Sequence, residues 1–352
     1  VFRAATYLAL TFPGMLWVTL HRGKELVGTT YEIYSGEVLA QFSTLPVFDF
    51  PGGTWVMSGA TQLLLFWKYL GLWFVPNPGW MSVDLRVDFP DLWNTAWTFF
   101  GVAASLLLFS AAAVVWWLPR SGKRHRSAAA VLLFAVVPFA VELSVVRIQE
   151  PLVLYRSYLW MPSFALMLCL ALLQVDGWLA GRGSRLPRRV FWAVMLAACV
   201  SLMPAAQDRL QSFSSEEALW RDAAQKLPSP DVAGADRIYY NLAGEAFKRG
   251  DFNAALQLSD RVVAQNPRAF QGYLAQGASL LALNRPDAAM QAFDTALLHQ
   301  PPTDFLGYIE FKRCGVLEAR GERDAAMACL RRSAALGYGM ARFRLKMAGI
   351  AE

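Results

Sequence analysis

The sequence has few cysteines, and they predict neither a metal centre nor a disulfide framework. Only four occur in 352 residues. Cys169 and Cys199 fall within long apolar runs, where a small soft side chain packs well. Cys314 and Cys329 lie in the more polar C-terminal part, at a spacing that matches no metal site. An oxidising compartment would permit a bridge between them, but the spacing alone does not predict one.

Charged residues are also scarce. They make up 17% of the chain against 55% hydrophobic residues, and the mean hydropathy is +0.31. A chain of this length and composition is not one soluble domain, and the apolar excess is concentrated in the first 206 residues. A transmembrane helix needs roughly 20 apolar residues. The candidate spans are Phe2–Leu20, Thr95–Leu118, Ala128–Val146, Tyr155–Val175 and Val190–Met203.

Acidic residues are missing from two short loops between these spans. Pro119–Arg126 and Gly181–Arg189 each hold four Lys or Arg, and these eight charges exceed the net charge of +6. The positive-inside rule therefore places both loops in the cytoplasm. The charge of these two loops also accounts for the pI of about 9.2. A nucleic-acid-binding protein would instead need a basic face on a soluble domain, and the C-terminal part has none. Counting spans from these loops puts Glu150–Ser163 on the outer face and everything after Pro204 outside the cytoplasm.

The segment between the first two confident spans, residues 21–94, has two interpretations. It contains Thr61–Pro76, which is apolar but short, with Lys68 at its centre. If Thr61–Pro76 crosses the membrane, Phe2–Leu20 must end in the cytoplasm, as the basic residues that follow it would favour. If it lies in the interface plane, residues 21–94 form one outer loop. The surrounding tryptophans are typical of an interface, so we favour the second interpretation.

Three charged residues, Arg147, Glu150 and Arg156, are predicted to lie at the outer membrane boundary. Charges at that depth are costly unless they pair or bind a ligand, so they form a candidate site. The alternative is that the arginines extend toward lipid head groups, within a belt formed by the aromatic residues of the same stretch.

A second candidate site lies in the outer segment, where Asp84, Arg86 and Asp88 alternate. On an extended backbone such residues share one face. Two carboxylates with an arginine between them could hold a divalent cation or a sugar hydroxyl. The alternative is a solvated loop with local ion pairs.

From Ala205 onward the chain becomes amphipathic and repeats with a period of 34 residues. The recurring pairs include Gly250 and Asn284, Ala255 and Ala289, and Pro267 and Pro301. This is the period of tetratricopeptide repeats, in which small residues let two helices touch and a terminal Pro ends the second helix. Two such units are followed by a looser third one with a Sel1-like end. They predict a short right-handed solenoid.

The predicted fold is therefore all-α. A multi-span transmembrane helix bundle occupies residues 1–206, with the outer loop 21–94. A connecting helix covers residues 207–236, and an extracytoplasmic tetratricopeptide and Sel1-like α-solenoid covers residues 237–352.

Two stretches resemble one family. Thr61–Asp84, which includes Gln62 and Tyr69, resembles the outer loop of transmembrane and tetratricopeptide-repeat O-mannosyltransferases and their bacterial relatives. Tyr155–Ser163 resembles their signature Glu-(His/Arg)-Arg-x-Tyr-Leu-Pro, but differs before the arginine and by one extra residue ahead of Pro162. The order of a membrane half and a repeat array is also similar.

The resemblance implies a multi-pass protein of the bacterial inner membrane, with its repeat domain periplasmic or extracellular. Its activity would be transfer of a sugar from a polyprenyl-phosphate donor to an extracytoplasmic protein. The family is similar to GT-C glycosyltransferases, whose catalytic acid lies in a first outer loop that would precede Val1. We therefore expect the chain to be the C-terminal part of a longer membrane enzyme, and its catalytic residues stay unassigned.

The residues expected to bind the donor phosphate or sugar are Arg156, Arg147, Tyr158, Glu150, Asp84 and Asp88. Arg156 would bind phosphate through bidentate contacts, with Arg147 as a second contact. Tyr158 would stack on sugar or isoprenoid, and Glu150 would orient Arg156. The expected partners are membrane lipid, the polyprenyl-phosphate sugar and a protein or peptide, without nucleic acid. No cofactor is expected beyond the divalent cation considered above.

Two other classes of protein fit parts of the sequence. A non-enzymatic, membrane-anchored tetratricopeptide scaffold would need only a concave groove, in which Tyr240, Phe247 and Lys248 face a bound peptide. A transporter would need charges deep in several spans, and Glu142 is the one acid inside a confident span. We therefore keep the scaffold as the alternative.

Overall fold

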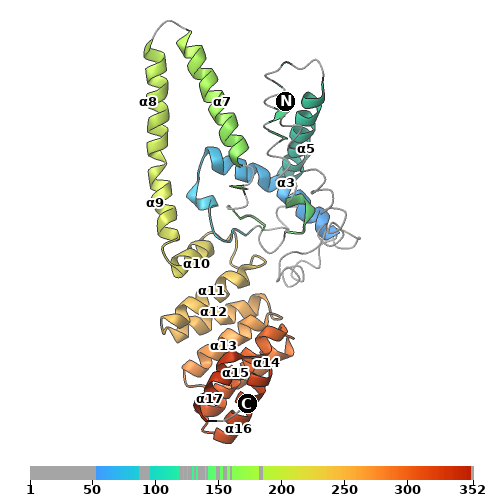
Figure 1. The fold of residues 1–352 in the computed structure, drawn as a ribbon, viewed down its shortest axis with the longest axis vertical. Coiled ribbons are helices and arrows are strands. Elements are labelled where there is room, and N and C mark those ends of the chain that lie inside the picture. Colours follow the sequence, from blue (N-terminus) through green and yellow to red (C-terminus); the bar gives the residue numbers. More distant parts are fainter. Residues whose placement is uncertain are drawn as a thin grey trace. The chain divides into compact units, whose positions relative to one another are not determined.

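The computed structural model describes residues 53–86, 96–118, 122, 125, 129–130, 132–133, 139, 142–147, 151–153, 157–158, 161–181 and 185–349. The chain divides into two compact units, Val1–Ser212 and Phe213–Glu352 (Figure 1). The regular elements in the described ranges are helices, and Leu85 and Leu152 form an isolated antiparallel bridge. The predicted all-α class is confirmed for this part of the chain.

The described helices of the N-terminal unit are α3 (Gly53–Phe74), the 3-10 turn η2 (Pro78–Trp80), α5 (Ala96–Trp117), α7 (Met161–Ala180), α8 (Arg185–Ser201) and α9 (Met203–Ser212). Within the described ranges, two stretches are long and apolar enough to cross a membrane, Phe99–Trp117 and Leu186–Ser212. Their hydrophobic side chains point outward, since Leu107 is 70% exposed and Leu196 is 67% exposed. An apolar surface of this kind indicates membrane association.

The predicted spans agree with these helices in part. α5 matches Thr95–Leu118 closely, whereas α7 begins at Met161 and continues to Ala180, beyond the predicted end at Val175. The predicted span Phe2–Leu20 lies outside the described residues, as does about half of Ala128–Val146.

α8 begins at Arg185, inside the predicted basic loop Gly181–Arg189, so that loop is shorter than expected. The reason is a polar closure of the α7–α8 hairpin. Arg188 donates to Asp176 from Nε and Nη2 at 2.7 and 2.8 Å, and Trp192 Nε1 donates to the same carboxylate at 2.7 Å. These contacts give the first turn of α8 partners across the hairpin.

α3 is longer than the predicted segment Thr61–Pro76, because it begins at Gly53 and ends at Phe74. Its buried side forms the centre of a hydrophobic core, in which the Phe66 ring lies 5.1 Å from that of Phe139. On another side, Lys68 Nζ lies 5.9 Å from the centre of the Trp80 ring. Placement of this helix in the interface plane stays a prediction.

The helices of the C-terminal unit are α10 (Glu216–Gln225), α11 (Ala235–Lys248), α12 (Phe252–Gln265), α13 (Phe270–Ala282), α14 (Pro286–Leu298), α15 (Thr303–Ala319), α16 (Arg323–Ala335) and α17 (Gly339–Met347). α11 packs on α12, α13 on α14 and α15 on α16, and the first helices of successive pairs also touch (Figure 1). α12 begins at Phe252 and α14 at Pro286, which is 34 residues later. The helix pairs thus follow the sequence period, while their assignment to the tetratricopeptide class stays a prediction.

Small residues allow the close packing within a pair. A Cβ atom on Gly277 of α13 would lie 2.5 Å from the Phe293 ring of α14. Ala289 and Phe293 are fully buried at the same contact. A larger residue at 277 would therefore force the two helices apart.

The turn that ends the first helix of each pair has a repeated geometry. Gly250, Asn284 and Gly321 have positive φ angles of 81°, 59° and 79°. In each case the next residue's backbone N–H donates to the carbonyl group five positions earlier, as in Arg285 N to Leu280 O at 2.9 Å. This is a Schellman motif, which needs a left-handed residue and so accounts for the recurring Gly and Asn.

Cys314 of α15 and Cys329 of α16 form a disulfide, with their Cα atoms 5.4 Å apart. The sequence did not predict this bridge, because the spacing of 15 residues has meaning only once the two helices are packed. Both residues belong to a hydrophobic cluster with Leu330 and Leu345.

Candidate functional site

The first candidate site is a buried junction in the N-terminal unit, where α3 binds residues 151–153. Gln62 Nε2 donates to the Pro151 carbonyl at 2.7 Å. The Tyr69 hydroxyl donates to the Val153 carbonyl at 3.1 Å and accepts from the Val153 N–H at 2.9 Å. Gln62 and Tyr69 are seven residues apart, so a helix presents them on one face. Leu85 also pairs with Leu152 of this segment in the isolated bridge.

The same helix also holds residues 143–147. Trp55 Nε1 donates to the Leu143 carbonyl at 2.8 Å, and Ser58 Oγ accepts from the Arg147 N–H at 2.7 Å. Gln62, Ser58 and Thr61 are fully buried. Buried polar groups require partners, which explains why this apolar helix carries them on its inner side.

Charged residues flank the junction as two close pairs. Arg86 Nη2 lies 2.6 Å from Asp84 Oδ2, and both side chains are almost fully buried. Arg147 Nε lies 3.3 Å from Glu142 Oε2, again with little exposure. The local ion pair expected at Asp84 is present, but it is buried and not solvated. The cation or sugar interpretation also involves Asp88, which lies outside the described residues, so it stays a prediction. Loss of one partner from such a buried pair costs about 3–5 kcal/mol, since it leaves an uncompensated charge.

The other predicted residues of the donor site are distributed differently. Tyr158 is 61% exposed, with its ring 6.1 Å from that of Trp73. Glu150, Arg156 and Asp88 lie outside the described residues, so their roles stay predictions. Within the described ranges, no three His, Cys, Asp or Glu side chains gather as a metal site.

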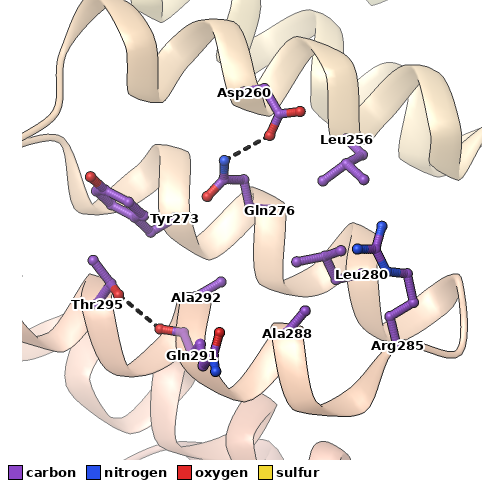
Figure 2. A pocket seen from close by; sticks show the side chains of 10 residues that line it. All are labelled: Leu256, Asp260, Tyr273, Gln276, Leu280, Arg285, Ala288, Gln291, Ala292 and Thr295. Carbon is purple, nitrogen blue, oxygen red and sulfur yellow. Dashed lines mark hydrogen bonds between the residues drawn. The ribbon is translucent and has the colours of Figure 1, made fainter.

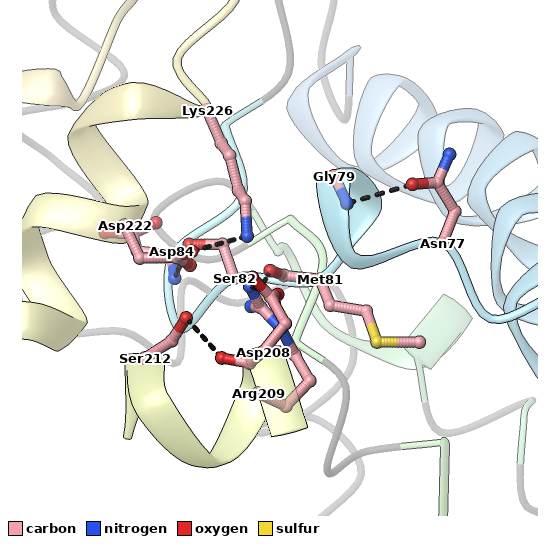
Figure 3. Close-up of polar contacts among 10 residues, drawn as sticks. All are labelled: Asn77, Gly79, Met81, Ser82, Asp84, Asp208, Arg209, Ser212, Asp222 and Lys226. Atoms are coloured by element: carbon pink, nitrogen blue, oxygen red, sulfur yellow. Dashed lines mark hydrogen bonds and ion pairs between the residues drawn. The ribbon is translucent and has the colours of Figure 1, made fainter. Parts of the chain in front are cut away.

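The loop that leads to Asp84 is attached to α9. Figure 3 shows the Arg209 guanidinium directed at the Met81 carbonyl, to which its Nη1 donates. Arg209 also pairs with Asp208 at 2.6 Å. Asn77 Oδ1 accepts from the Gly79 N–H at 2.9 Å and so begins η2. In the C-terminal unit, the same view includes the 2.6 Å ion pair between Lys226 and Asp222.

The second candidate site is a groove of about 590 Å³ in the C-terminal unit. It is lined by α10 and by the first helices of the three pairs, α11, α13 and α15. The three residues predicted for a peptide-binding groove, Tyr240, Phe247 and Lys248, all line it. Sequence reasoning missed Trp220 of α10 and Lys312 of α15. The 34-residue period contained a signal for Lys312, which follows Ala278 by one period.

Ion pairs attach α10 to this groove. Lys248 Nζ lies 2.7 Å from Glu216 and 2.6 Å from Glu245. These contacts raise the pKa of Lys248, and the hydrogen bond from Lys248 lowers the pKa of Glu216. Glu217 pairs in the same way with Arg249, whose hydrogen bond lowers the pKa of Glu217. Lys248 is thus held as a cation by two carboxylates at the edge of the groove.

A smaller cavity of about 360 Å³ lies among α12, α13 and α14 (Figure 2). Gln276 Nε2 donates to Asp260 Oδ1 at 2.7 Å across its upper side, and Thr295 Oγ1 donates to the Gln291 carbonyl at 2.8 Å below. Arg285 stands at one end and is exposed. Six of its ten lining residues are polar and the cavity is open to solvent, so we assign no ligand to it.

The chain matches no protein-family model and no curated protein sequence.

Proposed function

We propose that the chain is the C-terminal part of a membrane glycosyltransferase. In this proposal it moves a sugar from a polyprenyl-phosphate carrier to a polypeptide outside the cytoplasm. The observation that carries the proposal is the buried junction. Gln62 and Tyr69, from one stretch that resembles the O-mannosyltransferase family, hydrogen-bond to Pro151 and Val153, directly before the other such stretch. The first stretch thus contacts the residues that directly precede the second stretch, which are 84–89 positions away in the sequence.

The neighbouring charges suit an anionic donor. Arg147 is oriented by Glu142 at 3.3 Å, which is the role that the sequence suggested for Glu150 beside Arg156. An arginine fixed in this way can present a planar set of donors to phosphate oxygens. The groove of the C-terminal unit would receive the polypeptide acceptor, so one chain would contribute to binding both substrates.

The proposed topology has the basic loops inside and the repeat array outside the cytoplasm. The disulfide between Cys314 and Cys329 supports this arrangement, because structural disulfides persist in oxidising compartments. Buried hydrophobic residues between the helices give the array a core of its own, as a domain exposed to solvent requires.

Arg156 provides the sharpest test of the enzyme proposal. Arg156→Ala should weaken binding of a polyprenyl-phosphate analogue by roughly ten- to a hundredfold, because a charge-assisted hydrogen bond is lost. Arg156→Lys should retain only part of the binding, since lysine lacks the planar fork. Binding by Arg156→Ala within twofold of the unmodified protein would remove this residue from the site. Full tolerance of Lys would favour the aromatic-belt interpretation.

A second candidate function is the membrane-anchored scaffold. It is favoured by the completeness of the groove, whose lining residues all lie between Glu216 and Lys312 of the C-terminal unit. The gene sequence upstream of Val1 separates the two functions. Further spans and an outer loop with an Asp or Glu would support the enzyme, whereas a start codon only a few residues upstream would support the scaffold.

A further inference from the structure

The groove of the C-terminal unit is arranged in rows that follow the 34-residue period. One row contains Tyr240, Leu274 and Tyr308, which are equivalent positions of α11, α13 and α15. A second row, one helical turn further along each helix, contains Gly244, Ala278 and Lys312. An extended chain lying across the three helices would run along both rows and meet α11, α13 and α15 in succession.

The α11 end of the second row is open and is bordered by aromatic rings. A Cβ atom added to Gly244 would meet no other atom within 4 Å, so space for a side chain exists above it. Aromatic rings of Trp220, Tyr240 and Phe247 line the same part of the groove. Aromatic or large aliphatic side chains are the guests that such a pocket favours.

The α15 end is positively charged. Four charged residues line the groove, and Lys248 already engages both acids, Glu216 and Glu245. The remaining one, Lys312, lies with Nζ 5.2 Å from the centre of the Tyr308 ring. No carboxylate in the described part of the chain forms an ion pair with Lys312. Charge complementarity therefore favours an acidic group at this end.

We propose that the groove binds an extended polypeptide with an aromatic side chain over Gly244 and an acidic side chain against Lys312. Neighbouring packed helices are about 8–10 Å apart, so these two positions are separated by about 16–20 Å. An extended chain rises about 3.3 Å per residue, so the two side chains are about five or six residues apart. This inference rests on the proposed function in one respect, because it makes such a sequence the acceptor for the sugar.

The test measures binding of fluorescent peptides to the full chain in lipid nanodiscs. The probe is an amidated peptide with one Phe and one Asp about five residues apart. Replacing Asp by Asn, or Lys312 by Gln in the protein, should each weaken affinity about tenfold. The two changes together should weaken it no further, and Lys312→Arg should retain most of the binding. A matched peptide without Asp but with a free C-terminal carboxylate distinguishes an internal acid from a chain end. Tighter binding by that peptide than by the probe would overturn the internal assignment.

A second pair of variants tests the α11 end of the groove without disturbing the fold. Gly244→Trp should fill the groove and abolish binding. Gly339→Trp is the control. A Cβ added there also meets nothing within 4 Å, but Gly339 lies in α17, which does not line the groove. The proposal would be overturned if Gly244→Trp left the affinity for the probe unchanged. It would also be overturned if the affinity of Lys312→Gln lay within twofold of that of the unmodified protein.

Failure of this inference differs from failure of the enzyme proposal. Peptide binding that requires Gly244 and Lys312, in a full-length protein that transfers no sugar from a polyprenyl-phosphate donor, would support the groove and remove the enzyme. Sugar transfer to peptides that is unaffected by Gly244→Trp would support the enzyme and overturn the groove as acceptor site.

Discussion

At the scale of single residues, the Tyr69 hydroxyl acts as donor and acceptor for the same backbone residue. It satisfies both the N–H and the carbonyl of Val153, and the ring itself is 1% exposed. No water can replace it at such a site without a cavity. This hydroxyl thus fixes Val153, while Gln62 and Leu85 hold the neighbouring Pro151 and Leu152.

Tyr69→Phe should therefore destabilise the N-terminal unit. The change leaves the two buried backbone groups of Val153 unpaired, at a cost of about 1–3 kcal/mol. The thermal midpoint of the full chain in detergent should fall accordingly. Tyr158→Phe is the matched control, because that side chain is 61% exposed and its hydroxyl can remain in contact with solvent or head groups. Equal midpoints for the two variants would contradict the role given to Tyr69.

At the scale of elements, two carboxylates of α10 form ion pairs with the C-terminal end of α11. Ser215 begins the helix by accepting from the Ala218 N–H at 3.1 Å, and Glu216 and Glu217 then reach the basic end of α11. The helix also forms one wall of the groove. Loss of these ion pairs should loosen that wall.

Acid should detach α10 before it unfolds the helix pairs. The folded pKa values of Glu216 and Glu217 are lowered by hydrogen bonds from Lys248 and Arg249. A lowered folded pKa means that the contribution to stability is present above the unfolded pKa, about 4.3 for Glu, and is lost as pH falls through the folded value. Trp220 is the sole tryptophan in residues 213–352, so its fluorescence in that fragment reports the change. The transition should weaken with salt. Its persistence in a Glu216→Gln, Glu217→Gln variant would show another cause.

The contact between α13 and α14 gives a second prediction for an element. Ala289 is fully buried where the two helices meet, so Ala289→Trp should overpack the pair and cost about 1–3 kcal/mol. The thermal midpoint of the 213–352 fragment should decrease. Leu298→Trp, at a position that is 78% exposed on the same helix, should leave it nearly unchanged. An unaltered midpoint for Ala289→Trp would be evidence against the repeat assignment.

At the scale of the whole molecule, the proposed topology can be measured directly. In a protein whose other cysteines are replaced, a cysteine introduced at Ser127 should resist an impermeant thiol reagent in intact cells, because the preceding basic loop favours the cytoplasm. A cysteine introduced at Ser214 should react. Labelling of the cysteine introduced at position 127 would contradict the proposed topology.

Local patterns predicted the helix pairs, and long-range contacts were beyond them. The recurrence of Gly250 and Asn284 could be read from the sequence because a turn geometry depends on a few adjacent residues. The bond from Gln62 to Pro151 joins residues 89 apart, and no local period encodes it. The start of α3 at Gly53 was missed because its inner face carries polar residues that bond to other segments. Prediction of Lys312 as a groove residue would have required extending the 34-residue period from Ala278 of α13 to α15.

The disulfide between Cys314 and Cys329 has a consequence for biogenesis. Closing a loop of 15 residues contributes about 3 kcal/mol in the chain-entropy model, and only after oxidation. If the C-terminal unit is exported as proposed, Cys314 and Cys329 are still free thiols in newly made chains. The unit is then less stable and easier to keep unfolded for translocation. The bond then forms on the far side and makes export harder to reverse. Under this proposal, the redox state of these two sulfurs would record whether a given molecule has been exported.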